Sequence, residues 1–558
     1  MTMAEKVKSN ITGIVGGTVG VLLLLIVLLP FSLYIPWIQN IAKDYACEWA
    51  SEETGLDISI DRVLIKFPLD VSVDGLLVLD EQRDTMLSAS NFTAGVAVLP
   101  LFRLDVEVDE ASLADARYRM VSEDSSMVFK AQVEQCLVKG IGVDLDHNAV
   151  NLADGTVKGG NVNLDYYPDK VVTECDTAES SPWKIQAYHL KLENVDYAMT
   201  MLPTIDTLKV HLQAAELADG LVDTGSRKVD ARCLSIDTIA VRYIYPSERF
   251  AREYALAHPV PADTLCNPAD TVPWTIRADS LRLAGGELAY AQRDAKLFAG
   301  RGLDMRYLDV AGLNVAIDSL YNRGSDVNFA LRRLDLTENG SGLAVTRGEA
   351  SVAINSQLIS VEKAKLATLL SDISLDAHID LSIADNPSKG YIHVATDSRI
   401  ALQDVSKLMP EYAPVLKGIP QYSPLALKGE LSGNASRVDV TTLTADLPKY
   451  AHATVSGTIY NPTSFNAMSG DVKLDARFDN INFVKPTLLD RTMQNEVNFP
   501  PMSLTANAKL DHGRIAADAV MTLSTGKLVG TGSFNTNTDE DDLDASFNSF
   551  PVRAILPL

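Results

Sequence analysis

Apolar and polar residues alternate with a period of two along most of the chain. The alternation is clear in residues 58–67 near the start, in 183–187 and 190–193, and in 474–478 and 504–510. A strand with one apolar face and one wet face has this period, because successive side chains point to opposite sides of a sheet. The pattern therefore predicts a mainly β chain.

Helical spacing of apolar residues is limited to short segments. One amphipathic helix is predicted after Pro36, with Gly55 as its stop, and shorter helical patterns occupy residues 363–370 and 402–416. Strands and helices do not alternate as a βαβ fold requires, so a parallel α/β enzyme fold is not expected.

The sequence repeats itself at two fixed offsets. Residues 175–192 match residues 266–283 at an offset of 91. A weaker match at an offset of 77 relates residues 422–437 to residues 499–514. Repeated β units imply stacking, in which each unit buries its apolar face against its neighbours.

The N-terminal region has no charged residue from Ser9 to Ala42, and this predicts a membrane anchor. About 19 apolar residues suffice to cross the hydrocarbon of a bilayer, and residues 11–29 supply them. A cleaved signal peptide is the alternative, but it would have a shorter apolar core and a small-x-small cleavage site. We therefore expect an uncleaved transmembrane helix at residues 9–35. Its centre consists of Leu22, Leu23, Leu24, Leu25 and Ile26.

The charges around this segment predict its orientation. Lys6 and Lys8 precede it, and positive residues favour the cytoplasmic side. Residues 1–8 are therefore expected to form a cytoplasmic tail of a single-pass inner-membrane protein whose body is periplasmic. The formal net charge of −24 disfavours binding of nucleic acid, and it disfavours docking of the body on anionic headgroups.

No catalytic or cofactor motif is present in the sequence. It contains no GxSxG, P-loop, dinucleotide fingerprint, CxxC pair or HExxH. The carboxylates are numerous, but they fall on the predicted wet faces of strands, where a solvated surface is the simpler interpretation. We expect no enzyme, no metal and no cofactor.

Two further expectations concern the cysteines and the C-terminal residues. Cys175 and Cys266 are equivalent in the repeat and are expected to be free thiols, because equivalent positions would lie several strands apart at about 4.8 Å per strand. Residues 551–558 are mostly apolar, and a bare strand edge is normally covered. We expect that the chain is a fragment or that its last strand pairs with a partner.

The order of elements in the first 120 or so residues resembles a known family. After the anchor come PWIQN (36–40), GLDISIDRV (55–63), VSVDGLLVLD (71–80), DTML (84–87) and PLF (100–102). This order resembles the N-terminus of the AsmA-like superfamily, and it looks most like TamB-type translocation and assembly module proteins of Bacteroidetes-like bacteria. Repeated Leu-x-Leu units over the remainder are similar too.

The resemblance implies a fold and a function. The fold is an N-terminal transmembrane helix followed by an elongated, repeat-built β-sheet curled into a groove (β-taco-like). Family members are thought to conduct phospholipids between the inner and outer membranes, or to assist outer-membrane protein assembly. TamB-type proteins are usually longer and end in a domain that meets an outer-membrane barrel. That domain has no match here, so contact with a barrel would need a missing C-terminal part.

These observations divide the body into three parts. The expected parts are an AsmA-like N-terminal helix with the first strands (36–120), β-groove repeats (121–390, with units near 175–265 and 266–360), and a second type of β repeat (391–558, with units near 391–460 and 470–540).

The residues alone are compatible with two arrangements of the apolar face. A sheet must cover such a face, either by closing into a side-chain-filled core or by curling into a trough that holds acyl chains. The resemblance implies the trough. The expected lining residues are Trp183, Ile185, Leu190, Leu192, Trp274, Ile276, Leu281 and Leu283.

Three functions follow as hypotheses. The first is an inner-membrane-anchored periplasmic protein that conducts phospholipids towards the outer membrane. The second is a periplasmic scaffold or chaperone for outer-membrane protein assembly that uses strand edges and no lipid. The third is an envelope hydrolase with an unrecognised site.

Overall fold

The computed structural model describes most of the chain after its N-terminal segment. The described residues are 34–66, 70–80, 82–96, 107–122, 125–144, 147–167, 182–201, 206–257, 273–296, 302–383, 386, 388–410, 416, 419, 423–462, 464, 467–485, 491–524, 526–535 and 540–548. The predicted anchor, with Leu22 to Ile26, lies almost wholly outside these residues, and so do Cys175 and Cys266. Among the helices that the structure describes, none is long and apolar enough to cross a membrane.

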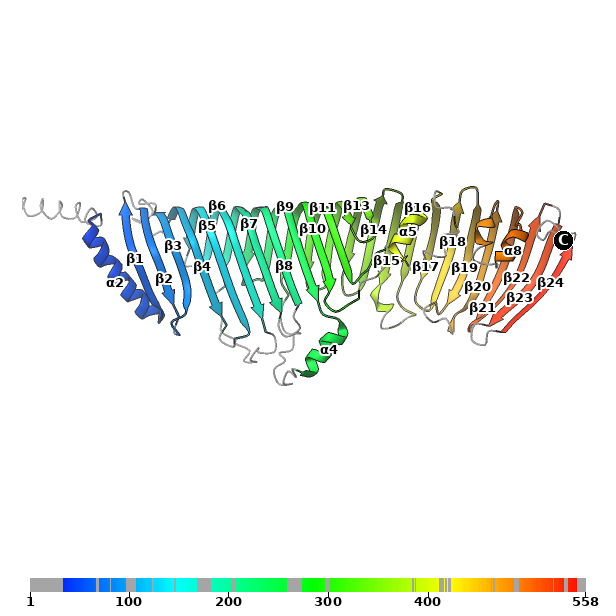
Figure 1. Ribbon diagram of the computed structural model, residues 1–558, viewed down its shortest axis with the longest axis horizontal. Coiled ribbons are helices and arrows are strands. Elements are labelled where there is room, and N and C mark those ends of the chain that lie inside the picture. The colour runs from blue at the N-terminus through cyan, green and yellow to red at the C-terminus, as the bar shows by residue number, and fades with distance from the viewer. Residues whose placement is uncertain are drawn as a thin grey trace, which may run out of the picture. The chain divides into compact units, whose positions relative to one another are not determined.

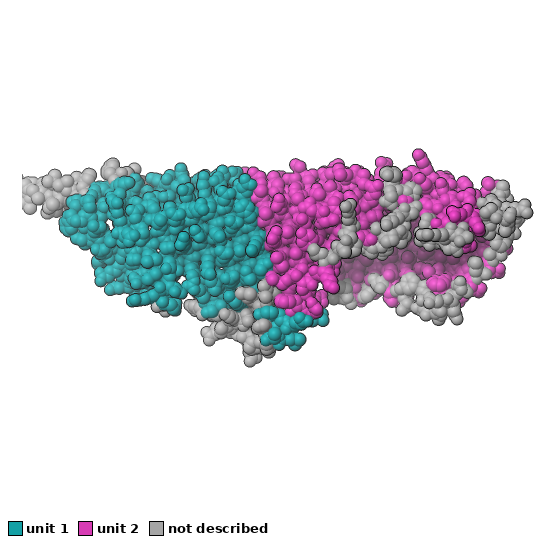
Figure 2. Space-filling model, viewed as in Figure 1, with its two compact units in different colours: residues 1–226, 251–270 teal, residues 227–250, 271–558 magenta. Residues whose placement is uncertain are grey.

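The chain divides into two compact units, coloured separately in Figure 2. Unit 1 comprises residues 1–226 and 251–270, and unit 2 comprises residues 227–250 and 271–558. Most described residues of both units lie in strands, so the mainly β prediction is confirmed.

In the described part of unit 1, helix α2 (Pro36–Thr54) comes first and the strands follow it. The strands are β1 (Asp57–Lys66), β2 (Asp70–Leu79), β3 (Thr85–Val96), β4 (Glu107–Val121), β5 (Met127–Asp144), β6 (Ala149–Tyr166), β7 (Lys184–Met201) and β8 (Asp206–Asp223). Neighbours in sequence are neighbours in the sheet (Figure 1). All pairs are antiparallel except β6 with β7, which is parallel.

In unit 2, too, strands that are adjacent in sequence pair with each other, and there are more of them. They are β9 (Lys228–Tyr245), β10 (Thr275–Gln292), β11 (Tyr307–Arg323), β12 (Asp326–Glu338), β13 (Leu343–Ile354), β14 (Leu358–Thr368), β15 (Asp372–Asp380), β16 (Ile392–Ile400), β17 (Leu425–Gly433), β18 (Arg437–Leu447), β19 (Ala451–Tyr460), β20 (Ser469–Phe478), β21 (Met502–Asp511), β22 (Arg514–Leu523), β23 (Gly526–Asn535) and β24 (Glu540–Asn548). The pair β9–β10 is parallel, and every later pair in sequence order is antiparallel. The helical segments described after β9 are α4 (Glu248–Ala257), η4 (Leu381–Ile383), α5 (Leu402–Leu408), η7 (Asn482–Val484) and α8 (Arg491–Glu496). Residues 251–257 of α4 are assigned to unit 1.

Both repeat offsets relate equivalent elements. The offset of 91 carries the bounds of β7 onto those of β10, and each of these strands pairs in parallel with the strand before it. The offset of 77 carries the start of β16 onto that of β20 and the starts of β17 and β18 onto those of β21 and β22. Helical segments follow both β16 and β20, namely α5 and the pair η7 and α8. The two sequence repeats are therefore repeats of strand order.

Helix α2 covers the free edge of β1. The Gln39 side chain is only 3% exposed and donates from Nε2 to the carbonyl oxygen of Ile65 at 3.0 Å. The backbone N–H of Ile58 donates to Ser51 Oγ, also at 3.0 Å. Gly55 ends the helix with a φ of 70°, as predicted. Because an uncovered edge strand is a template for unwanted pairing, this contact protects the first strand.

Single residues with positive φ interrupt the long strands of unit 1. Asp115 in β4, Gly159 in β6 and Asn194 in β7 have φ values of 48°, 62° and 53°. The ladder skips such positions, so that Gly159 and Asn194 stand opposite each other between regular pairs. Gly, Asn and Asp are the residues that tolerate this backbone conformation best. An interruption of this kind bends the strand and changes the phase of its alternation.

A strand residue with positive φ also explains one wrong prediction. Residues 363–370 form no helix: most of them belong to β14. Lys363 has a φ of 52°, and the ladder shifts between Val361 and Ala364. The shift spaces apolar residues three apart, which imitates a helical pattern. By contrast, the helical prediction for 402–416 is confirmed over its first part by α5.

Gly140 of β5 offers a test of these interruptions. Its φ is 60°, and an added Cβ would lie 2.7 Å from the Cβ of Ala153. We expect Gly140→Ala to lower the free energy of unfolding by about 2 kcal/mol, from left-handed strain and this clash. Gly142→Ala is the matched control, since its φ is ordinary and nothing lies within 4 Å of an added Cβ. Urea unfolding measures both, and equal effects would contradict the role given to Gly140.

Candidate functional site

The ladder of unit 1 aligns apolar side chains into rows that cross all of its described strands. One row consists of Ile58, Val78, Leu87, Tyr118, Ala131, Val162, Tyr197 and Val210. A second consists of Val63, Val73, Phe92, Leu113, Cys136, Val157, Leu192 and Ala215. A third consists of Ile65, Val71, Ala94, Ala111, Val138, Gly155, Leu190 and Leu217. We call the surface that these rows form the apolar face of unit 1.

Unit 2 continues the same arrangement within itself. One of its rows consists of Leu234, Leu281, Ile317, Leu331 and Ala350. Another, further along, consists of Leu443, Val455, Leu474, Ala506, Ala519, Gly530 and Ala545. These rows define the apolar face of unit 2.

Neither apolar face is packed as a closed core. Among the described residues, no large side chain is fully buried, and the buried apolar side chains of unit 1 are mostly alanines, such as Ala89 and Ala116. Ile185 in unit 1 and Ile276 in unit 2 are each 40% exposed. Central side chains of a sandwich or β-helix would be enclosed by a second layer. The described residues thus form one layer with one side open.

The structure places six of the eight predicted lining residues on β7 and β10, three on each. Ile185 lies between Val150 and Val222, and Leu190 lies over Gly155, where an added Cβ would be 3.0 Å from its Cδ1. On β10 the corresponding neighbours in β9 are just as apolar. The β10 pairs are Ile276 with Val229, Leu281 with Leu234, and Leu283 with Ile236.

The two predicted tryptophans lie just before these strands, outside the ladder. The Trp183 backbone is tied to Thr224, whose N–H donates to the Trp183 carbonyl at 2.9 Å. Trp274 is 41% exposed. The sequence repeat identified equivalent residues on β7 and β10 because the offset of 91 carries one strand onto the other, and both strands pair in parallel with the strand before them.

Polar residues gather on the side opposite to the apolar rows. Lys158 and Lys191 both pair with the carboxylate of Glu193, at 3.1 and 2.8 Å. His189 bonds Asp154 at 2.8 Å. The positions 189, 191 and 193 alternate with Leu190 and Leu192, so the charged residues and the leucines take opposite faces.

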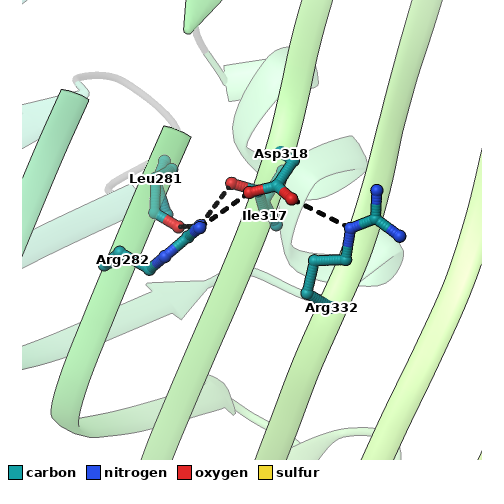
Figure 3. A network of polar contacts seen from close by, with 5 residues as sticks. All are labelled: Leu281, Arg282, Ile317, Asp318 and Arg332. Atoms are coloured by element: carbon teal, nitrogen blue, oxygen red, sulfur yellow. Dashed lines mark hydrogen bonds and ion pairs between the residues drawn. The ribbon is translucent and has the colours of Figure 1, made fainter. Parts of the chain in front are cut away.

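In unit 2 a carboxylate ties three strands together on this polar side (Figure 3). Asp318 of β11 accepts from Arg282 Nη2 of β10 at 2.7 Å and from Arg332 Nε of β12 at 2.9 Å. Arg282 Nη1 also donates to the carbonyl of Ile317 at 2.8 Å. Hydrogen bonds from Arg282 and then from Arg332 lower the pKa of Asp318.

Among the described residues of unit 2, the buried acidic side chains are Glu338, at the end of β12, and Asp404, in α5. Glu338 is 3% exposed, and its Oε1 accepts from the Gly340 N–H at 3.0 Å while its Oε2 accepts from the Ser341 N–H at 2.6 Å. Burial by itself would raise the pKa of Glu338, but these hydrogen bonds outweigh it and the pKa is lowered. Asp404, in α5, accepts from Ser371 Oγ at 2.7 Å. These bonds fix the loops and α5 at one end of the strands, and Figure 2 shows unit 2 hollowed near this region.

Sequence reasoning missed a cluster of tyrosines in unit 2. Tyr245 stacks on Tyr290 with 4.6 Å between ring centroids, and Tyr243 lies 5.9 Å from Tyr290. A hydrogen bond with Tyr290, with some desolvation, raises the pKa of Tyr245 to about 12. The period-two pair Tyr243 and Tyr245 was visible in the sequence, but its parallel pairing with Tyr290 was not. Tyr290 and Tyr243 form the ladder pair two residues along the strands from the apolar pair Leu288 and Val241, so the cluster adds aromatic surface beside that pair.

Among the described residues, no group of three or more His, Cys, Asp or Glu side chains is placed to hold a metal ion. The described cysteines are Cys47, Cys136 and Cys233, all unbonded. Burial raises the pKa of the Cys136 thiol, which lies within an apolar row. Each unit thus offers an apolar face backed by a polar one.

Asp318→Asn tests the contribution of the hydrogen bonds and ion pairs that join Asp318 to Arg282 and Arg332. The substitution leaves Arg282 and Arg332 without their shared counter-ion, and we expect it to cost about 1 kcal/mol at pH 7, the upper end for exposed ion pairs. Because the folded-state pKa is lowered, the contribution is present above the unfolded value of about 3.9 and is lost as pH falls through the folded value.

Urea unfolding at pH 7 and near pH 3 measures this effect. Asp279→Asn on β10 is the control, since Asp279 makes no ion pair with a residue that the structure describes. A difference from the parent that grows at low pH would contradict the assignment.

No protein-family model matches the sequence, and no curated protein is significantly similar to it. The likeness to AsmA-like proteins therefore stays an expectation from the sequence, and the geometry of the two faces is what supports a function.

Proposed function

We propose that the chain is an inner-membrane-anchored periplasmic protein that conducts phospholipids towards the outer membrane along its apolar faces. One observation carries the proposal: rows of apolar side chains cross every described strand of unit 1, and no described layer covers them. Large exposed apolar surfaces mark binding sites for proteins, membranes or ligands. Acyl chains fit such a surface because they need area and no hydrogen bonds.

The dimensions of the apolar face suit a hydrocarbon chain. Each row has one residue on each strand. A row that crosses eight strands includes seven spacings of about 4.8 Å and is therefore about 34 Å long. One leaflet of a bilayer holds about 15 Å of hydrocarbon. Each CH₂ removed from water on this surface contributes about 0.8 kcal/mol. An acyl chain has room to lie along a row and to shift to the next position at little cost, because neighbouring rows are equally apolar.

The alternative is a scaffold for outer-membrane protein assembly that pairs with client strands. Such pairing needs free backbone groups at a sheet edge. Strands β2 to β7 are paired on both sides, and the outer edge of β1 is covered by α2. Few edges are thus available in unit 1 compared with the area of its apolar face, which favours lipid over client strands.

Ile185→Asp and Ile276→Asp separate the two functions. Both positions are 40% exposed, so water can still reach the new carboxylate in the free protein. We expect the melting temperature to stay within a few degrees of the parent, while a photo-crosslinker placed at Leu190 or Leu281 captures at least about tenfold less lipid. The reason is that a charge in the acyl path must be desolvated.

Gln186→Asp is the matched control, since it adds the same charge one residue away, on the opposite face. It should leave lipid capture unchanged. A collapsed melting temperature for the two Ile variants, with no lipid captured at any position in the parent, would reject the conduit and favour the scaffold.

A further inference from the structure

The polar side of unit 1 contains a hollow that the lipid proposal does not use. Its volume is about 510 Å³. The residues that define its chemistry come from β4, β5 and β6: Arg117, Arg119, Lys130, Gln132, Asn161 and Asn163. In the ladder Arg117 stands opposite Gln132, and Gln132 stands opposite Asn161. The hollow extends from β2 to β6, and its polar side chains on β4, β5 and β6 form an aligned patch.

Three cations meet in this hollow without an equal number of carboxylates. Arg119 and Lys130 are direct cross-strand partners. Like charges placed opposite each other destabilise a sheet. Arg119 binds Asp84 at 3.1 Å, but neither Arg117 nor Lys130 makes an ion pair with a residue that the structure describes. No carboxylate is among the described lining residues.

This excess of positive charge is unusual for the molecule. The chain as a whole has a formal net charge of −24. A comparable hollow on the polar side of unit 2 has Lys473, Lys509 and Arg514 in its lining, but four aspartates join them. Cations that repel each other, in a chain with surplus carboxylates, suggest that an anion completes the hollow in unit 1.

The rest of the lining suggests what the anion carries. Guanidinium and ammonium groups bind phosphate through charge-assisted hydrogen bonds. Beside the cations lie three amides, and Asn163 Nδ2 donates to Asn161 Oδ1 at 2.7 Å, which orders two of them. Ser88, opposite Arg117, adds a hydroxyl. Amides and hydroxyls both donate and accept, so they suit a ligand with several hydroxyl groups.

We propose that this hollow binds a phosphate group attached to a hydroxylated skeleton, such as a sugar or polyol. The phosphate lies among Arg117, Arg119 and Lys130, and the hydroxyl groups face Gln132, Asn161 and Asn163. The same chemistry occurs in a free sugar phosphate and in a phosphoinositol lipid headgroup. The site lies on the side opposite to the apolar rows and does not rest on the conduit function.

Isothermal titration calorimetry on the full chain tests the site with glucose 1-phosphate, inorganic phosphate and glucose. We expect glucose 1-phosphate to bind more tightly than inorganic phosphate, and glucose not to bind. Lys130→Gln and Arg117→Gln should each weaken binding about tenfold, since each removes one charge-assisted contact. Their melting temperatures should not fall, because each substitution relieves repulsion.

Lys139→Gln is the matched control. Lys139 is also an exposed cation of β5 and pairs with Glu110 at 3.4 Å, outside the hollow. Sedimentation with phosphatidylcholine vesicles, with and without phosphatidylinositol, shows whether a headgroup is the source of the phosphate. Vesicle binding that needs phosphatidylinositol and is weakened by Lys130→Gln identifies the headgroup, and binding of glucose 1-phosphate alone identifies a free ligand.

Three results would overturn the site. Glucose binding as tightly as glucose 1-phosphate would show that the cations play no part. An equal loss in Lys139→Gln would show a general charge effect. Finally, the site would be disproved if neither the soluble phosphates nor the phosphatidylinositol vesicles bound in a way that Lys130→Gln weakens.

Discussion

Backbone hydrogen bonding between neighbouring strands holds this protein together. Each unit is a single layer, so a strand has neighbours beside it but no described layer packed across its whole apolar face. The ladder fixes the register, and the register in turn decides that Leu192 meets Val157 and Ala215 and that Glu193 meets Lys158. A slip by one residue would exchange the apolar and polar faces. Both proposed binding surfaces depend on that register.

The interruptions at residues with positive φ let long strands follow a bent sheet without losing this separation of faces. At Gly159 the missing side chain leaves space that the side chain of Glu134 occupies. At Asn194 a side chain that tolerates left-handed backbone replaces the glycine. Because such positions stand opposite one another in adjacent strands, the bend continues from strand to strand instead of being lost at each pairing.

Much of the strand content was predictable from the sequence, because an open layer keeps a clear difference between its two sides. The period of two, the helix after Pro36 and the repeat that links β7 to β10 all follow from side-chain pattern. The helical interpretation of 363–370 failed because a single left-handed Lys363 shifts the phase of the strand. Such a shift depends on one backbone torsion that Lys rarely adopts, so composition gives no warning of it.

The candidate sites also differ in how far the sequence could predict them. Ile185 and Ile276 were found from sequence because a repeat keeps their position relative to the strand start. The cation cluster of Arg117, Arg119 and Lys130 was not found, because it arises only when β4 and β5 are placed side by side. Likewise, the tyrosine cluster needs the parallel pairing of β9 with β10, which joins residues 47 positions apart in the case of Tyr243 and Tyr290. Cross-strand chemistry requires the register, which one sequence does not reveal.

The unit that recurs at an offset of 77 has a consequence for how a protein of this type changes through evolution. In the described ladder its strands pair with the strands before and after them, so its stability comes mainly from nearest neighbours. Duplication or loss of one such unit in the gene would add or remove strands while leaving the cross-section of the remaining sheet intact. The number of strands is thus a heritable variable that is separate from the chemistry of the faces.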